Sequence, residues 1–208
     1  NPKLTKMAAL AELRNNKPDR VVALLKDHLK SHEDPQLLII YGYSAIASGA
    51  IDDGKAALNR AIELDPSAPE PYLALARQTL NEDASKTKEA RELLSTGYNK
   101  NKKNVQIAAA LSQIRLSQNE SASAAKIIDE QLKLHDRSEQ SLELAGDFYQ
   151  YQEQQDKATA HYKQALEKNP ANFSSALKLG LLSLNQNDYQ AQLTAFTRAA
   201  KINPDHAQ

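Results

Sequence analysis

The side chains that could carry chemistry are few and scattered in this sequence. It has five histidines and no cysteine, which excludes thiol catalysis and disulfides. His28 and His32 stand four residues apart on one predicted helix, with Asp27 and Glu33 close by, and such a pair could hold a metal ion. No third ligand follows at a diagnostic spacing, so we interpret this pair as a solvated helix end. The sequence therefore predicts no metal site and no cofactor.

Motifs for catalysis are also missing. His161 stands beside Tyr162, a predicted packing residue, so packing between helices or surface exposure accounts for it. No glycine-rich phosphate loop occurs, and nothing resembles a nucleophile elbow. We therefore predict that the chain is not an enzyme and has no catalytic residues.

The charge of the chain is balanced, with 26 basic and 26 acidic residues. A nucleic-acid-binding protein usually needs net or clustered positive charge. The one basic cluster, from Lys100 to Lys103, falls between two predicted helices and is interpreted as a solvated loop. No apolar run approaches the length of a membrane span. We expect no nucleic-acid partner and no direct membrane insertion of this segment.

The elements that would position any functional group are helices. Between Glu139 and Pro170, two apolar stripes with helical spacing flank a short polar turn. Leu142 and Ala145 lie on one face of the first expected helix, and Tyr162 lies on the apolar face of the second. Pro170 lacks a backbone donor and disfavours helical geometry in the residue before it, so it ends the second helix. The stretch predicts a helix–turn–helix unit.

The same pattern recurs along the chain. Gly180 and Phe196 stand 34 residues after Gly146 and Tyr162, and Gly42 has the same place in an earlier block. A proline ends each of these three blocks. The pattern resembles the tetratricopeptide repeat, a helix–turn–helix unit of 34 residues.

Six repeats account for the whole chain as a single array. We place them at residues 2–34, 35–68, 69–104, 105–138, 139–172 and 173–206 of 1–208. The first and fourth depart from the pattern, because Ala9 and Ser112 replace the small glycine. In the third, the turn from Asn81 to Thr87 is longer than usual. The resemblance implies an all-α fold, a right-handed α-solenoid (superhelix) of stacked hairpins, with a concave groove lined by the first helices.

The resemblance also implies which residues line the groove. They stand at the ninth and thirteenth positions of the first helices: Tyr43, Arg77, Gln113, Asp147 and Leu181, with Asn81, Tyr151 and Asn185. This lining mixes aromatic, apolar, amide and charged groups, which suits an extended or helical peptide. The alternative is that several of these side chains only pack between helices. The clamp of Lys, Asn and Arg with which some members of the family hold a chaperone C-terminus is absent in this register.

We therefore expect a non-catalytic protein–protein interaction scaffold that binds a partner peptide or domain in the concave groove. The alternative is a structural or assembly module. It would self-associate as a homo-oligomer or belong to a bacterial cell-envelope complex for secretion, polysaccharide export or pilus assembly. The repeats resemble bacterial ones, so we expect the periplasm or cell envelope, with the cytoplasm as the alternative. The last expected helix keeps Leu193 and Phe196, which suggests a segment of a longer protein with a further repeat, helix or partner.

Overall fold

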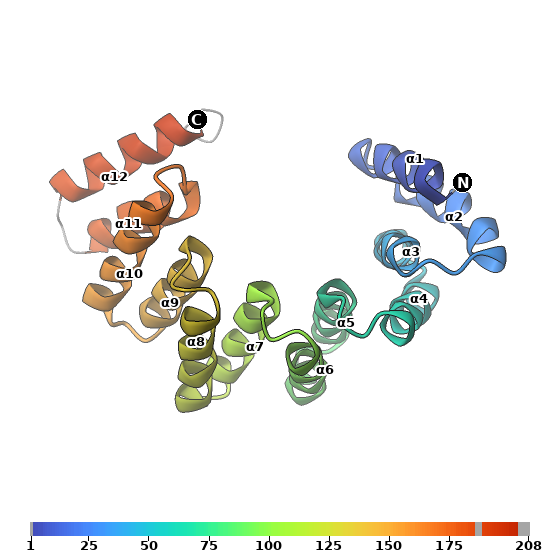
Figure 1. Cartoon of the computed structure of the whole chain (residues 1–208), viewed down its shortest axis with the longest axis horizontal. Coiled ribbons are helices and arrows are strands. Elements are labelled where there is room, and N and C mark those ends of the chain that lie inside the picture. The colour runs from blue at the N-terminus through green and yellow to red at the C-terminus, as the bar shows by residue number, and fades with distance from the viewer. Residues whose placement is uncertain (1, 186–188, 204–208) are drawn as a thin grey trace. The chain divides into compact units, whose positions relative to one another are not determined.

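The computed structural model describes residues 2–185 and 189–203, and every regular element in those ranges is a helix (Figure 1). Twelve helices are present there. Their bounds are α1 Pro2–Arg14, α2 Pro18–Ser31, α3 Pro35–Ala47, α4 Ile51–Leu64, α5 Pro69–Glu82, α6 Thr87–Lys100, α7 Val105–Ser117, α8 Ser121–Leu134, α9 Glu139–Tyr151, α10 Gln155–Lys168, α11 Phe173–Asn185 and α12 Tyr189–Ile202. The prediction of an all-α fold is confirmed.

The helices fall into two compact units, and each is described by itself. The first unit, Asn1–Ile107, holds α1 to α6 and the first turn of α7. Within it, α1, α3 and α5 lie side by side in one layer, and α2, α4 and α6 form the second layer (Figure 1). The second unit, Ala108–Gln208, holds the rest of α7 and α8 to α12. Consecutive helices pack together in the hairpins α1–α2, α3–α4, α5–α6, α9–α10 and α11–α12, and the twelve helices agree with about six helix–turn–helix repeats. Pro204, the expected end of the sixth repeat, lies outside the described residues.

Local signals in the sequence place the helix starts. Pro18, Pro35 and Pro69 occupy the first turns of α2, α3 and α5, where a missing backbone N–H costs no hydrogen bond. Asp34 precedes α3, and its Oδ1 accepts a hydrogen bond from the backbone N–H of Leu37 at 3.0 Å. These three helices therefore begin at residues that favour helix initiation.

The third hairpin has a shorter turn than the sequence predicts. The turn is expected to begin at Asn81, but α5 continues to Glu82 and residues 83–86 make the connection. The carboxylate of Glu82 accepts hydrogen bonds from Gln78, one helical turn earlier, at 3.2 Å and from Lys55 of α4 at 3.1 Å. Asn81 therefore lies in the last turn of α5 rather than in the connection.

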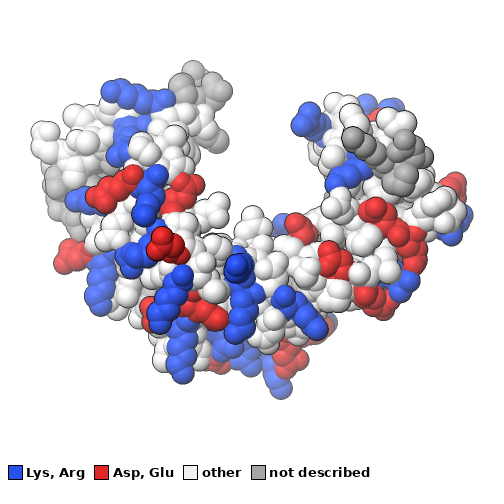
Figure 2. All heavy atoms as spheres, in the orientation of Figure 1, with Lys and Arg blue, Asp and Glu red and all other residues white. Residues whose placement is uncertain are grey.

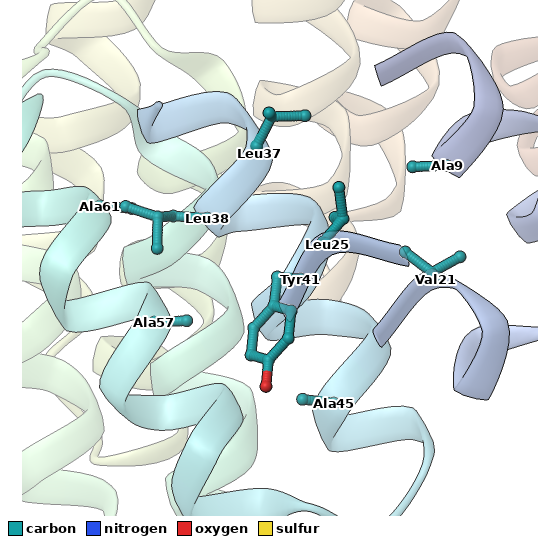
Figure 3. Close-up of a cluster of buried hydrophobic side chains, with 9 residues drawn as sticks. All are labelled: Ala9, Val21, Leu25, Leu37, Leu38, Tyr41, Ala45, Ala57 and Ala61. Atoms are coloured by element: carbon teal, nitrogen blue, oxygen red, sulfur yellow. The ribbon is translucent and has the colours of Figure 1, made fainter. Parts of the chain in front are cut away.

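The core of the first unit is continuous across its first two hairpins. Figure 3 shows nine buried side chains from α1 to α4 that meet in one cluster. They are Ala9, Val21, Leu25, Leu37, Leu38, Tyr41, Ala45, Ala57 and Ala61. The alanines allow the helices to approach closely, and the larger side chains fill the space between them. A second cluster of Leu58, Ala74 and Leu75 joins α4 to α5.

Residue sizes are matched where the two helices of a hairpin meet. A Cβ added to Gly146 would lie 2.4 Å from Cε1 of Tyr162, and one added to Gly180 would lie 2.5 Å from Cε1 of Phe196. At the corresponding positions of the other hairpins the pairs are Ala9 with Leu25, Gly42 with Leu58, Ala76 with Leu94, and Ser112 with Ile128. Both aromatic residues therefore face glycine, and alanine or serine occurs only opposite an aliphatic residue.

Two clusters lie among the last three helices of the second unit, whose buried residues also include Leu111, Ile128 and Phe148. One joins α10 to α11 and the other also includes α12, and their buried members are Ala158, Tyr162 and Leu182, and Leu166, Ala176 and Ala199. Throughout the described ranges, each helix lacks the combination of length and hydrophobicity that a membrane span requires.

Candidate partner-binding face

Most of the predicted groove residues with described side chains are exposed on the first helices, and Tyr43 is half-buried. In α9, Leu144, Ala145 and Phe148 are buried, whereas Asp147 and Tyr151 are exposed. Asp147 and Tyr151 are four residues apart, so they stand on one side of the helix. We call the surface formed by the ninth and thirteenth positions of the first helices the first-helix face.

In the first unit, the first-helix face is centred on Tyr43 and Arg77. The guanidinium carbon of Arg77 lies 5.8 Å from the centroid of the Tyr43 ring. The Tyr43 hydroxyl donates a hydrogen bond to the backbone carbonyl of Glu70 at 3.1 Å, which ties α3 to α5. Burial raises the pKa of Tyr43, and the nearby Arg77 opposes that rise. Tyr43 therefore packs between helices as well as bordering the face, while Arg77 and Asn81 are exposed.

In the second unit, three predicted residues meet at one cavity. Gln113 from α7 and Asp147 and Tyr151 from α9 line a cavity of about 340 Å³. Leu181, on α11, is 46% exposed. Asn185 ends α11, and its side chain lies outside the described part of the chain. The structure therefore brings three of the predicted residues together.

Lys178, which no sequence pattern indicated, connects two first helices in this part of the face. Lys178 of α11 lies with its Nζ 2.8 Å from Oε1 of Glu143 and 2.7 Å from Oδ1 of Asp147, both on α9. Its Nζ is also 5.7 Å from the centroid of the Tyr162 ring. Lys178 follows these acids by 35 and 31 residues, close to one repeat length. A search for opposite charges about one repeat apart could have found it.

The charges of this cluster stabilise one another. Burial by itself would raise the pKa of Glu143, but hydrogen bonds from Lys178, Ser174 and Asn172 outweigh burial and hold the pKa below its usual range. Burial would lower the pKa of Lys178, but Asp147 and Glu143 outweigh it and raise that pKa. Glu143 and Lys178 are therefore both ionised at neutral pH.

Tyr162 connects the cluster to the second helix of its hairpin. Its hydroxyl oxygen lies 2.7 Å from Oδ1 of Asp147 and 2.7 Å from Oε1 of Gln150. Burial, together with the neighbouring Asp147, raises the pKa of Tyr162, so the hydroxyl stays protonated and can donate. The orientation of Asp147 is thus determined by side chains from both α10 and α11.

The histidines do not form a reactive site in the described residues. The rings of His28 and His32 stack with centroids 5.5 Å apart, and His28 is half-buried rather than fully solvated. His161 stacks on Tyr149 with centroids 5.3 Å apart. Among the described residues, no group of three or more His, Cys, Asp and Glu side chains could hold a metal ion.

Basic and acidic side chains are interspersed on the side of each unit that Figure 2 shows. Several of them pair across neighbouring hairpins, as Lys55 does with Glu82 and Arg60 with Glu33. Such exposed pairs contribute little to stability. The visible surface has no extended block of one sign, which agrees with the balanced composition.

Comparisons with known proteins identify the hairpins. Residues 144–207 match the family model described as tetratricopeptide repeat. The hairpins have the tetratricopeptide-repeat fold. A thermophilic TPR protein of Thermus thermophilus, TTC0263, superimposes with a TM-score of 0.64 at 17% identity, over 88% of this chain and 100% of its own. PilW, a type IV pilus biogenesis factor, has a TM-score of 0.69 at 11% identity, over 98% of this chain and 94% of its own.

A third solved structure bears on binding. YrrB, described as a TPR protein with an unusual peptide-binding site, has a TM-score of 0.51 at 16% identity, over 88% of this chain and 93% of its own. At these identities the likeness concerns the fold. No protein of curated function matches the sequence.

The second unit of these tetratricopeptide repeats also has a larger hollow away from the first-helix face. It has a volume of about 690 Å³ and lies between α10 and α12, with Leu166, Leu179 and Ala195 among its apolar walls. The guanidinium of Arg198 borders it and donates to the carbonyls of Leu166 and Pro170 at 3.3 and 3.2 Å. None of the predicted groove residues lines this hollow.

Proposed function

We propose that this chain is a non-catalytic scaffold that binds a partner peptide or domain on the first-helix face of its tetratricopeptide repeats. The observation that supports this most directly is the exposure of large apolar side chains there. Tyr151 is 56% exposed and Leu181 is 46% exposed, on the first helices of successive hairpins. An exposed aromatic and an exposed leucine gain free energy when a partner covers them.

The polar groups of the face suit a polypeptide partner. A peptide that covers the apolar side chains must also satisfy its own backbone and charged groups. Arg77 and Asn81 are exposed on the face in the first unit, and Gln113 and Asp147 in the second. YrrB, described as having a peptide-binding site, has the same fold and supports this choice. Tetratricopeptide repeats are typically non-catalytic, and we propose the same here.

The test uses a randomised peptide library displayed on phage and selected against the purified chain. Selected peptides are synthesised with a fluorophore, and their dissociation constants are measured by anisotropy. We expect the double variant Tyr151→Ala with Leu181→Ala to weaken binding at least about tenfold, because each side chain loses apolar contact. The matched control is Leu134→Ala, since Leu134 is also an exposed leucine, 38% exposed, but lies on the second helix α8.

The first unit is tested separately with Tyr43→Ala and Arg77→Glu together. A weaker dissociation constant would show that the partner also contacts this unit. Peptides that bind all of these variants as tightly as the parent would contradict a binding role for the first-helix face.

A second candidate function is self-association or assembly, which the outer side of α1 favours. Leu4 and Met7 are 63% and 60% exposed. Leu4 stands at the third position of its helix. That position is buried in each of the other five first helices, where it is occupied by Leu37, Pro71, Ile107, Ser141 and Ser175. An apolar side of this kind could pack against a second copy or another subunit.

Light scattering over a range of concentrations tests this candidate. Self-association through α1 predicts a mass that rises with concentration and returns to the monomer value in Leu4→Gln with Met7→Gln. The control is Leu24→Gln, an exposed leucine on α2. A strict monomer at every concentration would argue against self-association and leave the peptide scaffold in place.

We also propose a setting in a bacterial periplasm or cell envelope, with the cytoplasm as the alternative. The fold is shared with PilW, a pilus biogenesis factor, which supports a role near a pilus or secretion complex. Cell fractionation with an antibody against the chain tests this proposal. Recovery with cytoplasmic markers alone would refute it.

A further inference from the structure

The cavity on the first-helix face of the second unit has a clear origin in the sequence. In the fifth hairpin, the Tyr162 ring lies against Gly146 and its hydroxyl reaches Asp147. The fourth hairpin has Ile128 at the position of Tyr162 and Ser112 at the position of Gly146. Isoleucine is shorter than tyrosine, so the volume that an aromatic ring would occupy is left open. Ser112 and Ile128 both line the resulting cavity.

The walls and mouth of the cavity differ in chemistry. Leu116, Ile128, Leu144 and Phe148 supply apolar walls. Ser112 is buried, and its Oγ has no hydrogen-bond partner among the described residues. At about 340 Å³ the cavity is near the lower limit of small-ligand pockets, so it suits one side chain rather than a peptide segment.

The mouth of the cavity has a net negative charge. Asp147 and Lys178 line it, and Glu143 is bonded to Lys178. Two carboxylates against one ammonium leave one negative charge. Glu143 is half-buried and accepts hydrogen bonds from three side chains. Asp147 accepts from Tyr162 and Lys178, but its side chain is still 45% exposed. The excess charge is therefore accessible at Asp147, next to the exposed ring of Tyr151, which can also hold a cation.

We propose that this cavity is the anchor site for the partner, and that it takes a phenylalanine-sized apolar side chain that stands next to a basic residue. The apolar side chain enters between α7, α8 and α9, and the adjacent cation lies between Asp147 and the Tyr151 ring. This inference rests on the proposed scaffold function and specifies the partner chemistry. A partner with an acidic residue at the same place would be repelled.

The first test uses three short probes in place of an unknown partner. They are N-acetyl-Phe-Arg-amide, N-acetyl-Phe-Glu-amide and N-acetyl-Ala-Arg-amide. Methyl resonances of Ile128 and Leu144 report occupancy of the cavity by NMR. We expect Phe-Arg to shift both resonances and to bind at least about tenfold tighter than Ala-Arg, because the ring is the buried group. Phe-Glu should bind more weakly than Phe-Arg, and Asp147→Asn should reduce that difference.

The second test fills the cavity with the pair that the fifth hairpin already uses. In Ser112→Gly with Ile128→Tyr, the tyrosine ring should occupy the space and abolish the effect of Phe-Arg on Leu144. The matched control is Ser112→Gly alone, which leaves the cavity open. Methyl spectra of the parent test the site directly, so the proposal remains falsifiable if the filled variant does not fold.

The outcomes separate this inference from the scaffold function. Peptides selected from the phage library that bind the parent and the filled variant equally would overturn the anchor site and leave the scaffold function standing. Equal binding of Phe-Arg and Ala-Arg, or equal binding of Phe-Arg and Phe-Glu, would also overturn it. Shifts by Phe-Arg without any selected peptide would support the cavity and count against the scaffold function.

Discussion

The effect of Gly146→Ala on the free energy of unfolding should depend on the size of the residue at position 162, which faces position 146. The added Cβ would lie 2.4 Å from Cε1, 2.6 Å from Cδ1 and 2.9 Å from Cζ of Tyr162. Unstrained carbon atoms prefer about 3.5–4.0 Å, so the ring must move by about 1 Å. Tyr162 is fully buried and hydrogen-bonded, so it has little room to move.

The magnitude follows from two opposing effects. Overpacking of this kind costs about 1–3 kcal/mol. Alanine is better than glycine inside a helix by about 0.8–1 kcal/mol. The net effect of Gly146→Ala beside Tyr162 should therefore be a loss of about 1 kcal/mol. In a Tyr162→Leu background the ring contacts are removed, but a leucine can still meet the Cβ, since one added to Gly42 would lie 2.6 Å from Cγ of Leu58. The same substitution should then cost less than beside Tyr162 and stabilise by at most about 1 kcal/mol. Ala76 with Leu94 is the natural precedent for that pair.

The assay is a double-mutant cycle in urea, followed by circular dichroism. Repeat proteins can unfold in parts, so amide hydrogen exchange of α9 and α10 gives the local opening free energy as well. The control is Gly49→Asn, because Gly49 has φ of 86° and an added Cβ would meet nothing within 4 Å. Asparagine tolerates this conformation, so the change should be small. A coupling energy below about 0.5 kcal/mol between positions 146 and 162 would refute the size-matching argument.

Three further predictions concern single groups. Asp34→Ala should cost about 1 kcal/mol in urea unfolding because it removes the cap of α3, while Asp34→Asn should cost less. Burial lowers the pKa of His161 below its usual 6.5, so protonation favours the unfolded chain. The free energy of unfolding should therefore fall as the pH drops below that value. His161→Gln should weaken this dependence, and an unchanged pH profile in the variant would contradict the prediction. Lys178→Met should cost about 1–3 kcal/mol at neutral pH because it leaves the carboxylate of Glu143 half-buried without its cation. The pKa of Glu143 is lowered in the folded parent, so its contribution to stability is present above pH 4.5 and is lost as the pH falls further. The difference in free energy of unfolding between Lys178→Met and the parent should therefore shrink in acid. A difference that stays constant with pH would contradict the pairing of Lys178 with Glu143.

Local and periodic patterns in the sequence account for the repeating part of the structure. Helical periodicity, the prolines and cap residues at helix starts, and the pairing of Gly146 with Tyr162 are local or recur at one fixed interval. For this reason the hairpins could be predicted from the residues alone, whereas the groove positions of α9 were implied by the resemblance to the tetratricopeptide repeat. Asp147 and Tyr151 are exposed because neighbouring positions of the same helix must be buried.

Only the tertiary structure shows which contacts and which cavity the exposed residues Asp147 and Tyr151 of α9 take part in. The pairing of Lys178 with Glu143 and Asp147 depends on rotamers and on the packing of α11 against α9, which no local pattern encodes. The cavity depends on the size of the Ile128 side chain relative to the space between the helices that surround it. Tyr43 likewise became a link between α3 and α5 only through its bond to a backbone carbonyl. Periodicity specifies which side of a helix faces the solvent, whereas contacts between repeats depend on side-chain size, reach and charge in three dimensions.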